Sequence, residues 1–284
     1  MKKEERVWRC CDRRILLART LVMGIVNVTP DSFSDGGQWF DAGRAIAHGL
    51  ELVAEGADIL DIGGESTRPG AEAVEEDEES RRVVPVIRSL VEQCGVPVSV
   101  DTRRPDVARA ALDAGACIVN DIRPLNHDES MAAVVRETGA GVVVMHMRGT
   151  PQTMAQFTDY ADVVSEVESE LRRAVTFAEA RGINCERVVI DPGIGFAKTT
   201  AQNVMLLAAT ARLSRIGPLL VGVSRKRFIG ELCGEPDVAG RIGGSVGAAV
   251  WCALHGASIV RAHDVKATRQ ALTVAREVDQ VAGL

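Results

Sequence analysis

The chain has 284 residues, of which 46% are hydrophobic and 25% charged, and its formal net charge is -6. This acidic balance argues against bulk binding to nucleic acid or to a membrane surface, and we expect neither as a partner. No apolar run reaches the roughly 18 residues of a membrane helix, no signal-peptide core is present, and the seven cysteines include no CxxC pair. We therefore expect a cytoplasmic protein with reduced thiols.

Short, continuous apolar runs recur along the chain with helix-forming stretches between them. They cover residues 21–26, 57–62, 96–100, 117–119, 141–145, 187–190, 219–223 and 257–260. Such runs are typical of strands buried on both faces of a parallel sheet. Eight strand–helix repeats predict an α/β fold, a single-domain (β/α)8 TIM barrel over residues 21–284, preceded by an N-terminal extension, residues 1–20. A doubly wound open sheet is the alternative, although no GxGxxG follows the first run.

Two of the intervening helical patterns are informative. From Ala161 to Ala178 the apolar residues recur at three- and four-residue steps, which predicts an amphipathic helix. A similar pattern from Val83 to Val91 contains Pro85, which should bend the helix. The acidic cluster Glu72–Glu79 precedes it, and we expect a solvated helix start there, favoured by the helix dipole, rather than a binding site.

Polar residues follow every apolar run. In chain order they are Asn27, the Gly63–Arg68 stretch entered through Asp61, Asp101, Asn120 with Asp121, His146, Asp191, Ser224 with Arg225 and Lys226, and Arg261 with His263. In a barrel the carboxyl ends of the strands share one rim, where the βα loops build the active site. Any one polar strand end can be a helix cap, but their convergence predicts a functional site.

The residue types at this rim suggest three binding tasks. An ionised carboxylate, such as that of Asp101 or Asp191, can accept two parallel N–H bonds from a heterocycle, while the amide of Asn120 both donates and accepts. Arg261 and His263 suit an anionic group. Asn27 offers one oxygen ligand, and Mg²⁺ often takes only one or two protein ligands. The long first loop, residues 28–37, is expected to act as a lid.

Eight stretches carry a family resemblance. They are MGIVNVTPDSFSDGG (23–37), GADILDIGGESTRPGA (56–71), VSVDT (98–102), VNDI (119–122), VVVMHMRGTP (142–151), DPGIGFAKT (191–199), GVSRKRFIG (222–230) and RAHDV (261–265). In this order they closely resemble dihydropteroate synthase over about residues 21–272. The resemblance implies a (β/α)8 barrel of folate biosynthesis. That family joins 6-hydroxymethyl-7,8-dihydropterin diphosphate to 4-aminobenzoate and releases diphosphate. It also implies Mg²⁺ as cofactor, sulfonamides as inhibitors and a homodimer.

The resemblance also implies site residues, matched position by position. The pterin pocket would be Asp101, Asn120, Met145, Asp191 and Lys226. The diphosphate would lie at Asn27, Thr67, Arg261 and His263, with Asn27 also the Mg²⁺ ligand. The 4-aminobenzoate would lie at Phe33, Arg68, Pro69, Phe196 and Lys226. Among these, Asp101, Lys226, Arg261 and His263 would carry the catalysis.

Two departures and two alternatives accompany this assignment. The chain has Ala197 where typical members have Gly, and Gln202 where they have His. One alternative is a pterin-binding methyltetrahydrofolate–corrinoid methyltransferase, which shares the barrel but needs neither the first two loops nor the Arg-x-His pair. The other is a non-catalytic pterin-binding barrel, which the intact Asp101 and Lys226 argue against.

Overall fold

The computed structural model describes residues 6–28, 42–66, 74–123 and 129–282. Within them, eight parallel strands form one sheet: β3 (Leu21–Asn27), β4 (Ile59–Gly63), β5 (Val98–Asp101), β6 (Ile118–Asp121), β7 (Gly141–Met145), β8 (Val188–Asp191), β9 (Leu220–Gly222) and β10 (Ile259–Ala262). The strand order is β8-β7-β6-β5-β4-β3-β10-β9. A parallel bridge between Ile190 and Leu219 brings the two edges together. The predicted barrel is therefore confirmed, and the open sheet is wrong.

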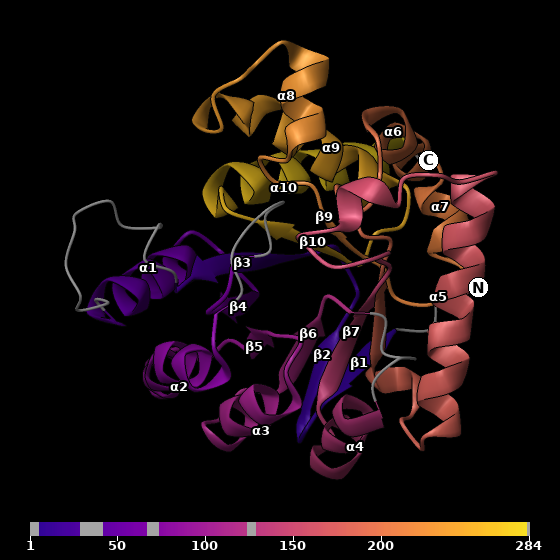
Figure 1. The fold of residues 1–284 in the computed structure, drawn as a ribbon. Helices are drawn as coiled ribbons and strands as arrows, with labels where there is room; N and C mark the ends of the chain where they lie inside the picture. The colour runs from indigo at the N-terminus through magenta and orange to yellow at the C-terminus, as the bar shows by residue number, and fades with distance from the viewer. Residues whose placement is uncertain (1–5, 29–41, 67–73, 124–128, 283–284) are drawn as a thin grey trace.

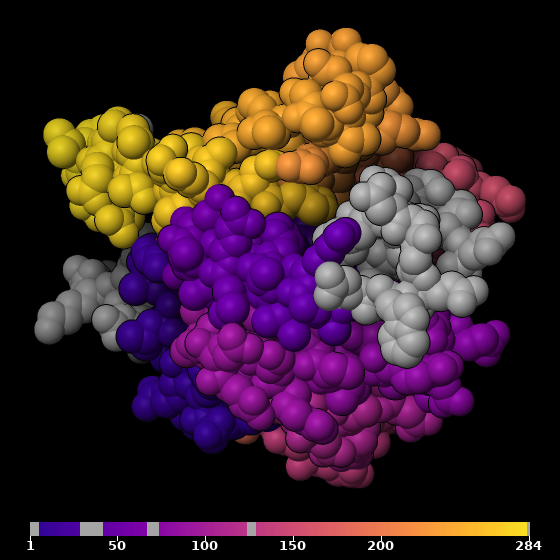
Figure 2. Space-filling view, turned by 90° about the vertical axis from the view of Figure 1, so that its left-hand side faces the viewer, coloured from indigo at the N-terminus to yellow at the C-terminus, as the bar shows by residue number. Residues whose placement is uncertain are grey.

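Helices surround this sheet (Figure 1). Those described are α1 (Ala42–Ala54), α2 (Glu76–Gln93), α3 (Pro105–Asp113), α4 (Glu129–Thr138), α5 (Val163–Ala180), α6 (Thr200–Ala208), α7 (Thr210–Leu213), α8 (Arg227–Cys233), α9 (Ile242–Leu254) and α10 (Val265–Ala282), with 3-10 turns η3 (Met154–Gln156), η4 (Cys185–Arg187) and η5 (Ala239–Arg241). In the space-filling view α8 projects beyond the surface formed by α1, α2 and α3 (Figure 2). None of the helices in the described ranges is long and apolar enough to cross a membrane.

The helix predicted from residue 161 is α5, and its start has a clear local cause. Asp162 Oδ1 accepts hydrogen bonds from the backbone N–H groups of Val164 and Ser165 at 3.0 and 3.1 Å. This N-cap satisfies donors that the first turn leaves without helical partners. The capped start and the apolar face of Val167 and Leu171 together fix the helix against the barrel.

Helix α2 begins within the acidic cluster and continues through Pro85. The expectation of a solvated start is wrong for Glu79, whose side chain is fully buried and forms an ion pair with Arg104. The physical reason is helical spacing: Glu79 lies four residues before the buried Val83 and therefore on the same, inward face. An Arg partner makes the burial of this carboxylate tolerable.

A β-hairpin precedes the barrel, formed by β1 (Val7–Cys10) and β2 (Arg13–Leu16). Its Trp8 and Cys10 are fully buried and pack with Met23, Ile118 and Val143. Trp8 Nε1 donates to the carbonyl of Arg187, just before β8, at 2.8 Å. The hairpin therefore covers the amino-terminal end of the barrel, a structure that the sequence did not predict.

Candidate active site

The strand register aligns the first group of predicted polar residues. Asn27 pairs with Gly63, Gly63 with Asp101, and Asp101 with Asn120. These positions lie at the carboxyl ends of β3, β4, β5 and β6, where barrel enzymes place their chemistry. Gly63 is closely packed in this row, since a Cβ there would lie 3.4 Å from the Cβ of Asp101, in ordinary contact. The register therefore brings Asn27, Asp101 and Asn120 to one edge of the barrel mouth.

A buried group of charged side chains connects this row to β10. Asp61 Oδ2 accepts hydrogen bonds from Asn120 Nδ2 at 2.9 Å and from Arg261 Nε at 2.6 Å. Arg261 Nη2 also donates to Asp101 Oδ2 at 2.7 Å. Arg261 was expected beside an anionic ligand, and in this structure it contacts the carboxylate of Asp101, which was expected to bind a heterocycle. A guanidinium has five N–H donors, so these two bonds leave others for a ligand.

Burial shapes the acid–base behaviour of these carboxylates. The pKa of Asp101 is raised because its site is desolvated and because Asp61, Glu79 and Asp121 add negative charge nearby, while Arg261 opposes the shift. Asp191 is also buried, which raises its pKa, although Lys226 acts in the opposite direction. Both carboxyls thus lie in surroundings that oppose ionisation, a feature frequent at functional sites.

The second group of predicted residues lies on β7, on β8 and in the loops after β8 and β9. Lys226 donates to the carbonyl of Ile194, and its ammonium lies 4.4 Å from the centre of the Phe196 ring. Desolvation lowers the pKa of Lys226 to about 8, and the negative charge of Asp191 limits that fall. Met145 pairs with Asp191 in the sheet and belongs with Phe196 to one small apolar cluster. The structure thus brings Met145, Asp191, Phe196 and Lys226 together.

The backbone of the loop after β8 requires glycine at two positions. Gly193 and Gly195 have φ values of 66° and 83°, in the left-handed region that favours glycine. A Cβ on Gly193 would lie 2.0 Å from the carbonyl oxygen of His146, and one on Gly195 would lie 2.9 Å from Lys226 Cδ. Ala197, one of the two departures from the family pattern, also has a positive φ, 50°. The other departure, Gln202, forms a capping box with Thr199 at the start of α6.

His263 follows β10, the strand that lies between β3 and β9. Its Nδ1 is 3.0 Å from Ser224 Oγ, and its backbone N–H donates to the same oxygen at 3.1 Å. The neighbouring Arg225 forms an ion pair with Asp264 at 2.5 Å. These contacts tie the loop after β9 to the end of β10, which fixes the position of His263.

Four predicted residues, Phe33, Thr67, Arg68 and Pro69, lie outside the described residues. No group of three or more His, Cys, Asp or Glu side chains that could hold a metal occurs in the described parts of the chain. His146 differs from the expectation that every strand end faces the shared rim. Its buried ring instead contacts Lys198 and Glu170.

Sequence reasoning did not assign a role to Asp61, Ser224 or Lys198. A signal for Asp61 existed, because a lone carboxylate inside the otherwise apolar strand ILDIG must find a buried partner. Ser224 and Lys198 stood in quoted motifs, but nothing in their spacing indicated that one holds His263 and the other His146.

Comparison with known proteins identifies the chain as a pterin-binding enzyme. Residues 23–263 match the family model described as pterin binding enzyme. A dihydropteroate synthase of Synechocystis is 46% identical over 258 residues, covering 90% of this chain and 89% of that protein.

Two solved structures are similar over nearly the whole chain. The dihydropteroate synthase of Xanthomonas albilineans with 4-aminobenzoic acid has a TM-score of 0.92 and 50% identity, covering 97% of this chain and 99% of that one. The same organism's enzyme in complex with 7,8-dihydropteroate has a TM-score of 0.87 and 48% identity, covering 95% and 98%. The chain belongs to the dihydropteroate synthase family, whose members are transferases of folate synthesis. This membership decides against the corrinoid methyltransferase alternative.

Proposed function

We propose that this protein condenses 6-hydroxymethyl-7,8-dihydropterin diphosphate with 4-aminobenzoate to give 7,8-dihydropteroate and diphosphate. The observation that carries the proposal is the convergence of Asp101, Asn120, Asp191 and Lys226 at one barrel mouth, beside Met145. Two carboxylates and an amide match the donor and acceptor edge of a pterin. The apolar face of Met145 suits contact with its ring.

The assignment of the second substrate follows from the position of Lys226. Its ammonium lies over the Phe196 ring and is also attracted by Asp191, so it borders both the pterin pocket and an aromatic surface. We assign Phe196 and Lys226 to 4-aminobenzoate, together with Phe33, Arg68 and Pro69, which lie outside the described residues. Sulfonamides share the shape of 4-aminobenzoate and should compete at this position.

The diphosphate is assigned to Asn27, Arg261 and His263, with Thr67 outside the described residues. Arg261 and His263 can hold anionic oxygens as the leaving group departs. The donor set also fits Mg²⁺, because the amide oxygen of Asn27 supplies one hard ligand at the rim and water and substrate phosphates commonly complete the coordination. When bound, the ion would neutralise charge on the leaving diphosphate.

The proposed reaction is a displacement at the methylene carbon of the pterin. The C–O bond breaks and diphosphate leaves with the electron pair, while Arg261 and His263 stabilise its growing charge. Asp101 and Asp191 hold the pterin, and their negative charge stabilises the cationic methylene that forms. The amine nitrogen of 4-aminobenzoate then bonds to that carbon and loses a proton to water.

An assay of product formation tests the proposed activity. Purified protein with both substrates and Mg²⁺ should form 7,8-dihydropteroate and release one diphosphate per product. Pterin binding without turnover would support the non-catalytic barrel instead. In single turnover without 4-aminobenzoate, diphosphate release supports bond cleavage before attack, and strict dependence on the amine would contradict that order.

We also propose that the protein is a cytoplasmic homodimer. All seven cysteines are free thiols, in keeping with a reducing compartment. An apolar groove of about 300 Å³ lies between α6, α8 and α9, with Leu232 59% and Trp251 47% exposed beside it. Exposed apolar surfaces of this kind mark interaction sites. Light scattering should give twice the chain mass, and Trp251→Glu should give the monomer; a wild-type monomer at micromolar concentration would contradict the dimer.

A further inference from the structure

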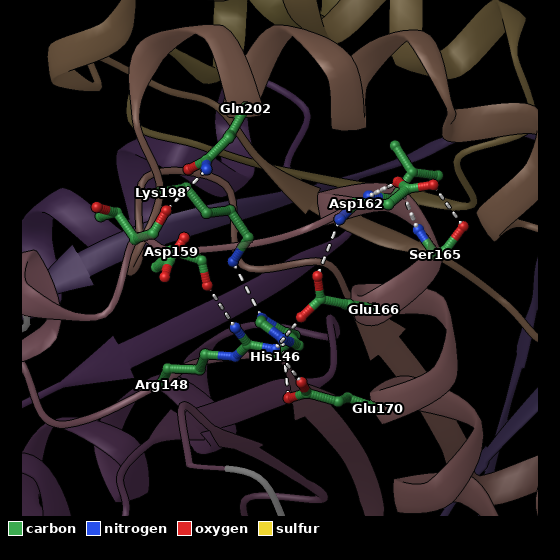
Figure 3. Close-up of polar contacts among 11 residues, drawn as sticks. His146, Arg148, Asp159, Asp162, Ser165, Glu166, Glu170, Lys198 and Gln202 are labelled. Atoms are coloured by element: carbon green, nitrogen blue, oxygen red, sulfur yellow. Dashed lines mark hydrogen bonds and ion pairs between the residues drawn. The ribbon is translucent and has the colours of Figure 1, made fainter.

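A row of connected polar and charged side chains contacts the loop that follows β8, and none of them is assigned to a substrate. Lys198 is 5% exposed, and its Nζ donates to the carbonyls of Gly193 and Phe196 at 3.0 and 2.8 Å. The same Nζ lies 3.0 Å from His146 Nδ1 (Figure 3). An ammonium has three N–H donors, so the protonated Lys198 satisfies all three within this site.

His146 connects Lys198 to helix α5. Its Nε2 lies 3.0 Å from Glu170 Oε2, and Glu170 Oε1 accepts from Arg148 Nη2 at 2.5 Å (Figure 3). With Nδ1 accepting from Lys198, the neutral imidazole carries its proton on Nε2, which lies close to the carboxylate of Glu170 without the angle of a hydrogen bond. The lysine therefore receives its orientation from His146 and a compensating negative charge from Glu170.

The carbonyls of Gly193 and Phe196, which accept from Lys198, lie at the two ends of the loop segment that contacts Lys226. Ile194, between them, accepts a hydrogen bond from Lys226, and the Phe196 ring lies under the Lys226 ammonium. The backbone here has three positive φ values, at Gly193, Gly195 and Ala197. Glycine adopts such values readily, whereas they cost energy at Ala197, and the hydrogen bond from Lys198 to the carbonyl of Phe196 holds the peptide just before Ala197.

We propose that Lys198 is a positioning residue for the reaction: oriented by His146 and Glu170, it fixes residues 193–198 so that the Ile194 carbonyl and the Phe196 ring place Lys226. This inference rests on the proposed function for its kinetic consequences. Its structural part, the anchoring of the loop by Lys198, stands on the contacts alone.

The protonation of Lys198 is part of this arrangement. Desolvation lowers the pKa of Lys198 to about 7; Asp191 and Glu170 raise it, and Lys226 and Arg148 lower it further. His146 is the remaining titratable group in contact, and burial lowers its pKa so that it favours the neutral form. Below about pH 7 Lys198 is protonated and holds both carbonyls. Above this pH the neutral amine has two N–H donors for three acceptors, so one contact is lost.

Substitution of Lys198 by Met tests the anchor, because it keeps the length of the side chain and removes the donors. At pH 6 we expect kcat/KM to fall on the order of tenfold to a hundredfold, with a raised KM for 4-aminobenzoate and a lowered kcat. Lys198→Arg should recover part of that loss. The matched control is Lys266→Met at an exposed position of α10, which should keep wild-type constants.

The pH profile separates positioning from a merely structural role. Because Arg stays protonated, Lys198→Arg should shift the alkaline limb, the pH at which kcat/KM falls on the alkaline side, to a higher value, toward the pKa of Lys226. Glu170→Gln removes a charge that raises the pKa of Lys198, so it should move the limb downward. Glu168→Gln, on the same helix but paired with Arg172 and Arg212, should leave the limb unchanged.

Hydrogen exchange gives a readout independent of turnover. In Lys198→Met the amides of residues 193–198 should exchange faster than in the wild type, and the rest of the barrel should not. Exchange and kinetics equal to the wild type would overturn the proposal, as would unmoved alkaline limbs in both Lys198→Arg and Glu170→Gln. If Lys198→Met does not fold, the pH profile of Glu170→Gln, a change at a partly exposed site, tests the proposal instead. A wild type without product formation would refute the proposed function, and the exchange would still test the anchor.

Discussion

Asp61 and Arg261 are 200 residues apart in sequence, and in the folded barrel Arg261 Nε donates to Asp61 Oδ2 at 2.6 Å. Asp61 is fully buried and also accepts from Asn120, while Arg261 continues to Asp101. One carboxylate thus orients two of the side chains that we assign to substrates. Removing one member of a buried charged pair leaves the other uncompensated, which is costly.

The first prediction concerns this carboxylate. Asp61→Asn should weaken binding of 7,8-dihydropteroate at least tenfold, because Asn120 and Arg261 lose a common charged partner. Calorimetric titration measures the dissociation constant. The control is Asp58→Asn, since Asp58 also pairs with two arginines, Arg19 and Arg269, but lies before β4 at the opposite end of the barrel. It should lower the melting temperature with little effect on binding. Equal losses of affinity in both variants would contradict the prediction.

The second prediction concerns pH. The pKa of Asp101 is raised by burial, so this carboxyl stays protonated to higher pH than an ordinary aspartate, whose pKa is about 4. Two N–H bonds from a pterin require the ionised form. Affinity for 7,8-dihydropteroate should therefore rise with pH above that ordinary value, and in Asp101→Asn the affinity should be lower and its pH dependence weaker. Binding titrations from about pH 4.5 to about pH 8 measure this dependence, because that range covers the raised pKa values of Asp101 and Asp191. A flat wild-type profile would show that the carboxyl is ionised throughout.

The third prediction compares two small residues in the loop after β8. Gly193→Ala should destabilise the protein by more than about 2 kcal/mol, because its Cβ would meet the His146 carbonyl and its φ is positive. Ala197→Gly removes a side chain from another left-handed position, so relief of strain and loss of a buried methyl should nearly cancel, within about 1 kcal/mol. Denaturant unfolding measures both. A benign Gly193→Ala would mean that the loop can adopt another backbone path.

The fourth prediction concerns the hairpin at the amino-terminal end of the barrel. Trp8→Ala should cost about 3–5 kcal/mol of folding stability, because a fully buried indole and its hydrogen bond to Arg187 are lost. The kinetic constants of the folded fraction should stay within about twofold, since active sites of this fold lie at the other end. Leu16→Ala is the control in the same hairpin, because Leu16 is 52% exposed and should have little effect. A loss of kcat in folded Trp8→Ala would show that the hairpin shapes the active site.

The sequence by itself determined the barrel and the identity of most candidate residues. Continuous apolar runs favour strands covered on both faces, and eight of them with helices between them leave few topologies. The polar residue at each run's end could then be placed on the shared rim from chain order alone. Asp101, Asn120 and Asp191 lie there because each stands at or next to the carboxyl end of its strand.

Only the tertiary structure decided which polar groups meet. Whether Arg261 bonds to Asp61, whether His146 faces the mouth or Lys198, and whether Glu79 is solvated depend on side-chain directions across strands and helices far apart in sequence. The hairpin of residues 7–16 is too short to reveal its burial by periodicity, and it is stabilised by the barrel that it covers. Burial also sets the pKa values of Asp101 and Lys198, because desolvation depends on the whole surroundings of a group rather than on its neighbours in the chain.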